Sequence, residues 1–365
     1  MKLKAHYTKR TLKFKFDAGT SRGILREKQA YFIHIYDDKH PEIVGVGECG
    51  PLSGLSLDDR PDFEQKLQKI CENISKNPIE ITNVWVDSSV LIDSACQYFV
   101  PEHLPSIRFG LETALYDRLN GGKRIVFDNE FSRGEKSLPI NGLIWMGDTA
   151  FMLNQIETKL QQGFSCLKMK VGAIDWESEH KILQNLRERF SEKELSLRVD
   201  ANGAFSPAQA KVILAELAKL KVHSIEQPIA AGQTAAMAEL CRNTPTPIAI
   251  DEELIKHTHF DARNELIEQI KPQYLVLKPS LLGGFAACSE WISIAETNSL
   301  GWWITSALES NIGLNAIAQF TAQFLVNMPQ GLGTGQLYTN NIESPLCIDN
   351  GFLQYQPHLQ WEEEL

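Results

Sequence analysis

The stretch Ser-Leu-Arg-Val-Asp-Ala-Asn-Gly-Ala-Phe-Ser-Pro, residues 196–207, predicts the passage from a buried strand to a helix. A short apolar strand ends on Asp200, and a loop follows it. Ser206 is typical of a helix N-cap and Pro207 of a first helical turn, so we expect a helix that runs on to Leu220. The stretch is therefore one strand–helix unit.

The same unit recurs along the chain after residue 135, where short apolar strands alternate with longer amphipathic segments. Eight strands joined by helices favour a closed parallel barrel over an open doubly wound sheet. No Gly-x-Gly-x-x-Gly follows the first strand, which lowers the odds of a dinucleotide fold. The expected strands are 138–143, 166–171, 196–200, 222–226, 247–251, 274–278, 302–306 and a weak one near 331–335.

The first third of the chain has another pattern. Segments 12–16, 30–36 and 42–48 are rich in aromatic and β-branched residues or alternate with period two, which predicts an antiparallel meander. The period becomes helical from about residue 58, and the clearest helix, 104–119, ends at a Gly-Gly pair. We therefore expect a smaller α+β module before the barrel.

Bulk composition excludes several classes of protein. The chain has 365 residues, 43% hydrophobic and 22% charged, which is typical of a globular protein. A net charge of −10 argues against nucleic acid or an anionic membrane as partner, but a small anionic substrate is compatible with a local cation. We find no membrane span and no signal peptide. The seven widely spaced cysteines favour a reducing cytoplasm, and the sequence leaves the oligomeric state open.

Ionisable residues fall where the predicted strands end. The steps between these strand ends are 30, 26, 25 and 27 residues, about one strand–helix repeat each. Equivalent positions of a barrel form a ring at its C-terminal mouth, where barrel enzymes keep their chemistry. The residues are Lys168 and Lys170, Asp200, Glu226, Asp251 and Lys278.

Three of these strand ends carry carboxylates. Taken alone, Asp200 could cap a helix and Glu226 could be an ordinary loop residue. Together with Asp251 they would repel one another unless a cation lay between them. All three offer hard oxygen ligands, which favours magnesium, with manganese as a substitute, over zinc or copper.

The lysines indicate the reaction. Lys168 and Lys170 are two residues apart, so both point to the same face of a strand, and Lys278 comes from across the mouth. Burial, a neighbouring ammonium and a nearby cation all favour a neutral lysine, which can then act as a base. This set suits abstraction of a proton next to a carboxylate, with the metal stabilising the enediolate.

The motifs that carry these residues resemble the enolase superfamily, in its muconate-lactonising branch, over nearly the whole chain. The resemblance implies an α/β fold, a (β/α)7β-type TIM-like barrel with an α+β capping domain made mainly from the N-terminal part. The expected domains are 1–125 (cap), 126–336 (barrel) and 337–365, a segment packing on the cap. The motifs are Lys168-Met-Lys170-Val-Gly, Asp200-Ala-Asn-Gly-Ala-Phe, Glu226-Gln-Pro, Asp251-Glu252 and Lys278-Pro-Ser.

The resemblance also implies a role for each residue. Asp200, Glu226 and Asp251 match the magnesium ligands. Lys170 matches the base that takes the α-proton, Lys168 its partner, and Lys278 the lysine on the opposite face of the substrate. Asn202 and Glu252 are expected to support the ligands. Two cap loops, near 19–23 and 50–55, are expected to cover the mouth.

Within the branch, the segment at the expected eighth strand of the barrel indicates the substrate. Dipeptide epimerases carry Asp-x-Asp at strand eight to hold an ammonium, whereas this chain has Gly333-Thr-Gly335, which suits a carboxylate tail. The resemblance implies a hydro-lyase that dehydrates a succinyl-bearing hydroxycyclohexadiene carboxylate in menaquinone biosynthesis. Ser306, the backbone near Gly333 and Arg22 are candidates for binding the tail. An N-acylamino acid racemase is the alternative, and a non-catalytic barrel would require a missing ring residue.

Overall fold

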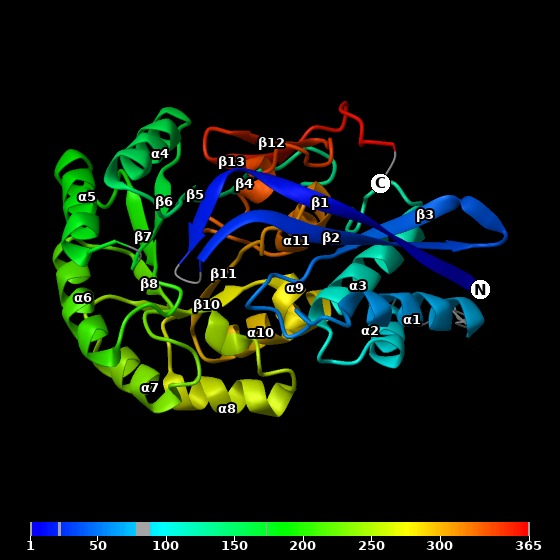
Figure 1. Cartoon of the computed structure of the whole chain (residues 1–365), viewed down its shortest axis with the longest axis horizontal. Coiled ribbons are helices and arrows are strands. Elements are labelled where there is room, and N and C mark those ends of the chain that lie inside the picture. Colours follow the sequence, from blue (N-terminus) through cyan, green and yellow to red (C-terminus); the bar gives the residue numbers. More distant parts are fainter. Residues whose placement is uncertain (1, 21–22, 78–87, 173, 364–365) are drawn as a thin grey trace.

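The computed structural model describes residues 2–20, 23–77, 88–172 and 174–363. Seven parallel strands form one curved sheet in chain order, with helices packed on its outer face (Figure 1). The strands are β5 (Gly142–Ile144), β6 (Cys166–Lys170), β7 (Ser196–Asp200), β8 (Ser224–Glu226), β9 (Ile248–Ile250), β10 (Tyr274–Leu277) and β11 (Gly301–Ile304). The helices are α4 (Thr149–Gln161), α5 (Trp176–Arg189), α6 (Pro207–Lys219), α7 (Thr234–Asn243), α8 (Phe260–Ile270), α10 (Phe285–Thr297) and α11 (Asn311–Thr321), with the short η1 (Glu252–Leu254) and α9 (Pro279–Leu282).

Two residues close the barrel between β11 and the first strand. Gln330 forms a parallel bridge with Ile140, and Gly331 forms one with Thr305. The Gly331 amide also donates to the carbonyl of Ile304 at 2.8 Å. A Cβ at Gly331 would lie 2.0 Å from Thr305 Oγ1, so only glycine allows this approach. The barrel expected from the sequence is therefore confirmed.

The two strands beside this closure differ from the prediction in extent. The expected strand 138–143 divides into β4 (Leu138–Pro139), which leaves the barrel to pair with β13 (Phe352–Tyr355), and β5. The expected strand 331–335 turns instead into the 3₁₀ helix η2 (Thr334–Gln336). Both barrel strands are short because the chain leaves the sheet, before β5 to pair with β13 and after Gly331 to form η2.

The expected meander is confirmed and its strands are longer than predicted. β1 (Leu3–Thr20), β2 (Gly23–Asp37) and β3 (His40–Cys49) pair antiparallel. β3 lies directly on α3 (Pro105–Leu119), and a Cβ at Gly47 would be 1.9 Å from the carbonyl of Gly110. The helices α1 (Phe63–Lys76) and α2 (Ser88–Phe99) complete this part of the molecule.

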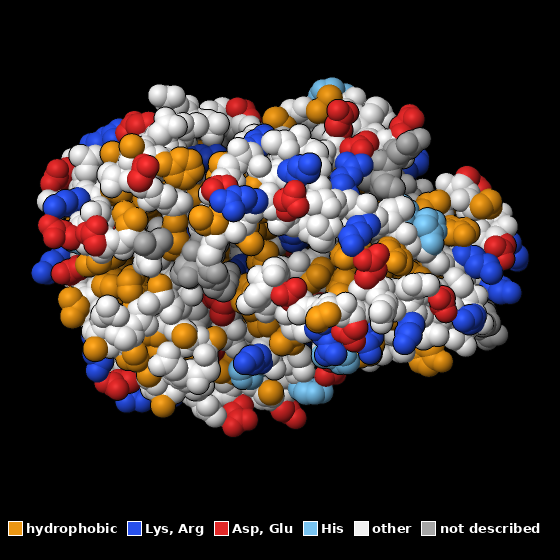
Figure 2. Space-filling model, viewed as in Figure 1, with side chains coloured by type: hydrophobic (Ala, Val, Ile, Leu, Met, Phe, Trp, Pro, Cys, Tyr) orange, Lys and Arg blue, Asp and Glu red, His pale blue; other side chains and the backbone are white. Residues whose placement is uncertain are grey.

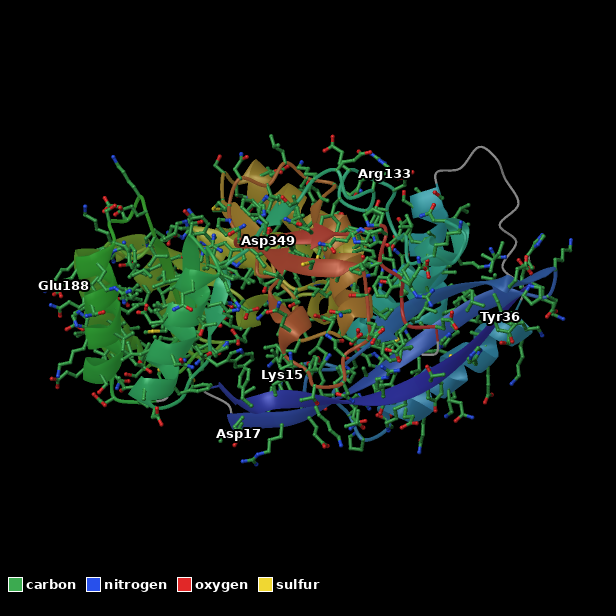
Figure 3. All side chains as sticks on the ribbon, turned by 90° about the horizontal axis from the view of Figure 1, so that it is seen from above. Lys15, Asp17, Tyr36, Arg133, Glu188 and Asp349 are labelled. Carbon is green, nitrogen blue, oxygen red and sulfur yellow. The ribbon has the colours of Figure 1, made fainter. Side chains whose placement is uncertain are left out.

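The β1–β2 hairpin reaches across to the barrel. Figure 3 shows Lys15 and Asp17 on the portion that lies along the barrel, with Tyr36 at the opposite end of the ribbon. Gly19 pairs with Met146, which follows β5, in an antiparallel bridge. This pairing explains why β1 continues to Thr20, into the cap loop expected near residues 19–23.

The last part of the chain contacts the first. Arg10 Nη2 lies 2.5 Å from Glu362 Oε1, and the Lys13 amide donates to Asn340 Oδ1 at 2.8 Å. These contacts fit a C-terminal segment that packs on the cap, although the division at residues 125 and 336 stays a prediction. β12 (Leu346–Asp349) pairs with β13.

The described surface carries mixed charge. Figure 2 shows basic and acidic side chains interspersed over the visible face. None of the described helices has the length and apolar character needed to cross a bilayer.

Burial of His34 on β2 should make the protein less stable in mild acid. His34 stacks on His6 with ring centroids 4.6 Å apart, and its burial lowers its pKa to about 4. The unfolded chain, with an ordinary histidine pKa near 6.5, binds the proton first, so this contribution is full above pH ~6.5 and is lost as the pH falls toward about 4, at about 1 kcal/mol per pH unit. Urea unfolding between pH 7 and 5 should show a shallower decline for His34→Gln. His40→Gln, at an exposed histidine, should keep the parent slope. A parental slope in His34→Gln would contradict this account.

Candidate active site

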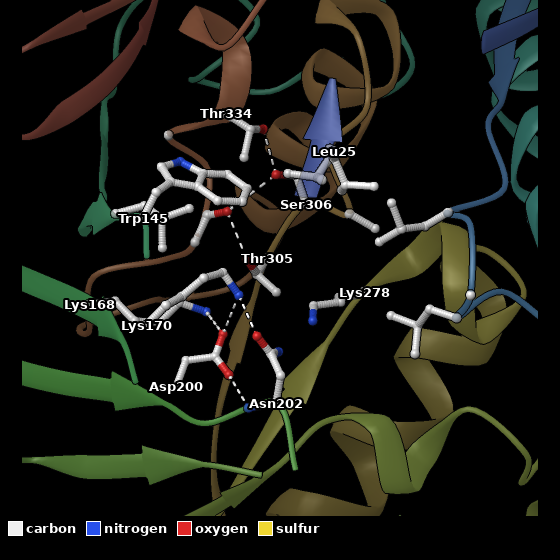
Figure 4. Close-up of a pocket in the computed structure, with 18 of the residues that line it drawn as sticks. Leu25, Trp145, Lys168, Lys170, Asp200, Asn202, Lys278, Thr305, Ser306 and Thr334 are labelled. Atoms are coloured by element: carbon white, nitrogen blue, oxygen red, sulfur yellow. Dashed lines mark hydrogen bonds and ion pairs between the residues drawn. The ribbon is translucent and has the colours of Figure 1, made fainter. Parts of the chain in front are cut away.

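A cavity of about 520 Å³ lies at the C-terminal mouth of the barrel, under the cap (Figure 4). The cap contributes walls through residues 52–55, within the second expected loop, and through 23–25, which begin at the end of the first expected loop and lie at the start of β2. Arg22, a candidate for the substrate tail, lies outside the described residues. The floor is formed by strand ends.

The register of the sheet places three of the ring residues at one level. Lys170 pairs with Asp200, and Asp200 with Glu226, across β6, β7 and β8. On β6, Leu167 and Met169 belong to the core cluster that includes the barrel helices, so the alternating lysines face the barrel interior. The other strand ends supply Asp251 and Lys278, and all six ring residues of the prediction are brought together.

Lysines and carboxylates alternate in this ring. Lys168 Nζ donates to Glu226 Oε2 at 2.8 Å and lies 3.5 Å from Asp200 Oδ2. Lys170 Nζ donates to Asp200 Oδ2 at 3.0 Å. On the other side, Lys278 Nζ pairs with Asp251 and lies 3.8 Å from Glu226 Oε1.

These contacts shift the pKa values of the ring residues. Burial opposes the ionised form of Asp200, but Lys170 and Lys168 outweigh it and hold the pKa of this carboxyl well below its usual range. Burial alone would lower the pKa of Lys168 and Lys278, which is the effect of burial that was expected from the sequence. The attraction of Glu226 and Asp200 for Lys168, and of Asp251 and Glu226 for Lys278, outweighs it, so both pKa values are raised. With the carboxylates uncompensated by another cation, these two lysines are held charged.

The carboxylates fit a hard divalent cation. Glu226 Oε1 is buried and accepts no hydrogen bond from the described residues. Burial and the adjacent Glu252 raise the pKa of Asp251, against the attraction of Lys278. Lysine ammonium groups lie between the acids, and within the described chain no three acidic, histidine or cysteine side chains are grouped closely enough to hold an ion as they stand. The donor set, three oxygen ligands with no sulfur or nitrogen, suits magnesium.

Asn202 and Glu252 lie where the sequence predicted supporting residues. Asn202 Oδ1 accepts from Lys170 Nζ at 2.6 Å, and Asn202 Nδ2 donates to Glu252 Oε1 at 3.1 Å. Asn202 therefore holds the Nζ of Lys170 together with Asp200 and links it to Glu252.

The expected tail-binding residues line the far wall. Ser306 and Gly333 both face the cavity, and Ser306 Oγ shares a hydrogen bond of 2.6 Å with Thr334 Oγ1. Thr334 was not singled out from the sequence. Its one signal was its position between the two glycines of the Gly-Thr-Gly segment.

Trp145 is a second residue that the sequence did not assign. Its ring centre lies 5.7 Å from Lys170 Nζ, and the side chain forms a wall of the cavity (Figure 4). Gln155 of α4 clamps the backbone of Trp145, accepting from its amide at 2.9 Å and donating to its carbonyl at 3.1 Å. A tryptophan directly after a barrel strand was the available signal.

A closed barrel with Lys-x-Lys on one strand, carboxylates at the ends of the next three and a lysine after the following one defines a class of enzymes. The family described as "Enolase C-terminal domain-like" matches residues 152–357. The chain belongs to the enolase superfamily.

Relatives narrow the placement within this superfamily. The chain is 47% identical over 363 residues to the o-succinylbenzoate synthase of Desulfotalea psychrophila (strain LSv54 / DSM 12343), covering 95% of this chain and 97% of the relative. The crystal structure of MenC from Desulfotalea psychrophila LSv54 superposes with a TM-score of 0.86 at 42% identity, covering 97% and 100% of the two chains. This similarity places the chain in the o-succinylbenzoate synthase family.

The epimerases of the superfamily are more distant. A dipeptide epimerase from Enterococcus faecalis V583, complexed with Mg and the dipeptide L-Leu-L-Tyr, has a TM-score of 0.83 at 18% identity, covering 97% of each chain. That likeness shows a shared fold.

Proposed function

We propose that the protein is an o-succinylbenzoate synthase, which dehydrates 2-succinyl-6-hydroxy-2,4-cyclohexadiene-1-carboxylate to o-succinylbenzoate in menaquinone biosynthesis. The observation that carries the proposal is the pair Lys170 and Lys278, facing one cavity from opposite sides of a carboxylate ring. The family placement supports the same activity.

Asp200, Glu226 and Asp251 would hold Mg²⁺, and Mn²⁺ could replace it. The bound ion supplies positive charge for the substrate carboxylate, whose negative charge grows when the neighbouring proton leaves. The chain's own contribution is to bury these three acids at the barrel mouth, and the register of β7 and β8 sets Asp200 level with Glu226.

Lys170 acts as the base and then as the acid. Its Nζ takes the proton from the ring carbon next to the carboxylate, and the C–H electrons pass into an enediolate. The hydroxyl group on the adjacent carbon then leaves with the proton returned by Lys170, as water, and the ring becomes aromatic. Asn202 holds the Nζ of Lys170 in place for both transfers.

Lys278 would lie over the other face of the ring. Its ammonium, on the side of the cavity opposite Lys170, would stabilise the anionic π system rather than remove a proton. Lys168, paired with Glu226 and Asp200, adds positive charge beside the base.

The far wall suits a carboxylate tail. The segment after β11 and the closing residues offer hydroxyl and backbone groups, from Ser306, Thr334 and Gly333, to the cavity. Among the described lining residues the one acid is Asp200, on the opposite floor. An ammonium tail would find no carboxylate at this wall, which favours the succinyl group over a dipeptide.

The enzyme would act on this small anionic substrate in the cytoplasm. All seven cysteines are unpaired, and six are buried, which suits a reducing compartment.

The test is an assay of purified protein with Mg²⁺ on two substrates. Ultraviolet absorbance should report formation of o-succinylbenzoate from the cyclohexadiene at a kcat/KM of about 10⁴ M⁻¹s⁻¹ or more, the ordinary range of enzymes. Polarimetry with N-succinylamino acids serves as the comparison, with a much lower kcat/KM expected. Racemisation without dehydration would replace the proposed function by the racemase.

A further inference from the structure

Three buried charged side chains meet where the cap joins the barrel, beside the cavity. Lys28 on β2, Glu48 on β3 and Glu309 before α11 are 6%, 0% and 1% exposed. Lys28 Nζ lies 3.8 Å from Glu48 Oε1 and has no hydrogen-bond partner among the described residues. Burial raises the pKa of Glu309, and Lys28 counteracts this, so the lysine serves both acids.

Glu48 ties the cap to a barrel helix. Its carboxylate accepts from the amide and hydroxyl of Ser310, at 2.9 and 2.6 Å, and from the amide of Gly313 at 3.0 Å. The two amides are among the free backbone donors at the start of α11, so a carboxylate from the cap caps this helix. The contact fixes β3 relative to the barrel.

Glu309 ties two barrel segments to each other. It accepts from the hydroxyl of Ser280, two residues after Lys278, and from the amide of Ala307 at 2.7 Å. Ala307 follows Ser306, which lines the cavity. The cluster therefore connects the lysine side of the cavity to its tail-binding wall.

The cap segments that form the cavity's lips adjoin the same cluster. Leu25 is three residues before Lys28, and the segment 52–55 begins four residues after Glu48. The ammonium of Lys28 lies beside Gly50, two residues before the second segment, since a Cβ at Gly50 would be 2.7 Å from its Nζ. Movement of Lys28 would shift both lips.

Burying three charges is a poor way to gain stability, because apolar side chains of similar size often do as well. A buried charge cluster does restrict how two parts can sit against each other. We propose that Lys28, Glu48 and Glu309 are positioning residues, which hold the cap segments 23–25 and 52–55 against the Ser306 wall and so set substrate affinity. The reaction named above supplies the kinetic readout, and in that respect this inference rests on the proposed function.

The first test compares Lys28→Met with Lys15→Met, a change at an exposed lysine on the same sheet. Lys28→Met should raise KM for the cyclohexadiene substrate by about tenfold while kcat changes less than about threefold, because the lips touch substrate and the base does not move. Lys15→Met should match the parent. A folded Lys28→Met with the parent KM would overturn the proposal, and a fall confined to kcat would do so as well.

A second variant separates a loss of stability from a change in the position of the cap segments. Lys28→Met leaves Glu48 and Glu309 without their cation, whereas Lys28→Met/Glu309→Gln leaves only Glu48, which keeps its three donors. The double variant should regain thermal stability and retain the raised KM. Recovery of both stability and KM would show a purely structural role and overturn the proposal.

Hydrogen exchange gives a readout independent of the reaction. Amides of residues 23–25 and 52–55 should exchange faster in the double variant, while those of β7 stay at the parent rate. Unchanged exchange at both lips would overturn the proposal even in a fully active enzyme. A parent that lacks dehydratase activity would instead refute the proposed function, and the exchange result would still decide the role of the cluster.

Discussion

Replacement of Lys170 by alanine should lower kcat by about 10³-fold, since a positioned general base contributes about 10²–10⁴ and this lysine serves both proton transfers. Lys170 Nζ lines the cavity and is held by Asp200 and Asn202 at 3.0 and 2.6 Å. Steady-state kinetics on the cyclohexadiene substrate would measure the loss. Circular dichroism and the thermal midpoint should show that the variant folds.

The matched control for this change is Lys181→Ala. Lys181 lies on α5, exposed and paired with Glu177 one helical turn away, so its loss should leave kcat at the parental value. Lys170→Ala with parental kcat would refute the assignment of the base. An equal loss in both variants would point to damage to the fold.

Withdrawal of divalent cations should abolish turnover, and added Mg²⁺ or Mn²⁺ should restore it. Without the ion, its positive charge no longer lies between the three buried carboxylates and the substrate carboxylate. The expected fall in kcat is about 10³-fold or more, which corresponds to the several kcal/mol of stabilisation that a Lewis-acid ion supplies. Dialysis against EDTA followed by metal titration would measure it. Mg²⁺ should also raise the thermal midpoint, because it binds the folded state alone.

Glu226→Gln sharpens the metal test. The variant keeps a side chain of the same shape but loses one charge, so half-maximal activity should require at least about tenfold more Mg²⁺, the lower end of what lost metal-site contacts cost. Glu177→Gln, on the exposed face of α5, should keep the parental requirement. Full turnover of the chelated parent would exclude a metal-dependent mechanism.

The sequence predicted the ring well because repeat spacing depends little on tertiary detail. Similar steps between Lys170, Asp200, Glu226 and Asp251 reflect one strand and one helix each, and the sheet register brings the ends of neighbouring strands side by side. The alternation of lysine and leucine or methionine on β6 likewise fixes which side chains point inward.

Other features could not be predicted, because they depend on long-range contacts. The eighth strand consists of Gln330 and Gly331, whose pairing depends on neighbours far away in the chain. Trp145 follows an ordinary apolar run, and nothing local shows that its ring would face Lys170. Lys28 and Glu48 resemble the polar positions of exposed strands, yet both are buried once α11 meets the cap.

The contact between the two ends of the described chain bears on the order in which the enzyme becomes competent during synthesis. β1 is made early, but the partners of Arg10 and Lys13, Glu362 and Asn340, are made 352 and 327 residues later. Domains generally fold as units from the N-terminal side as the chain is made. Here β1 of the hairpin can pair near Met146 early, but its contacts with Asn340 and Glu362 form only after that later segment has been made. A ribosome-bound chain can thus assemble the ring of strand-end residues before these contacts fix the cap hairpin. The substrate cavity is then completed late in maturation.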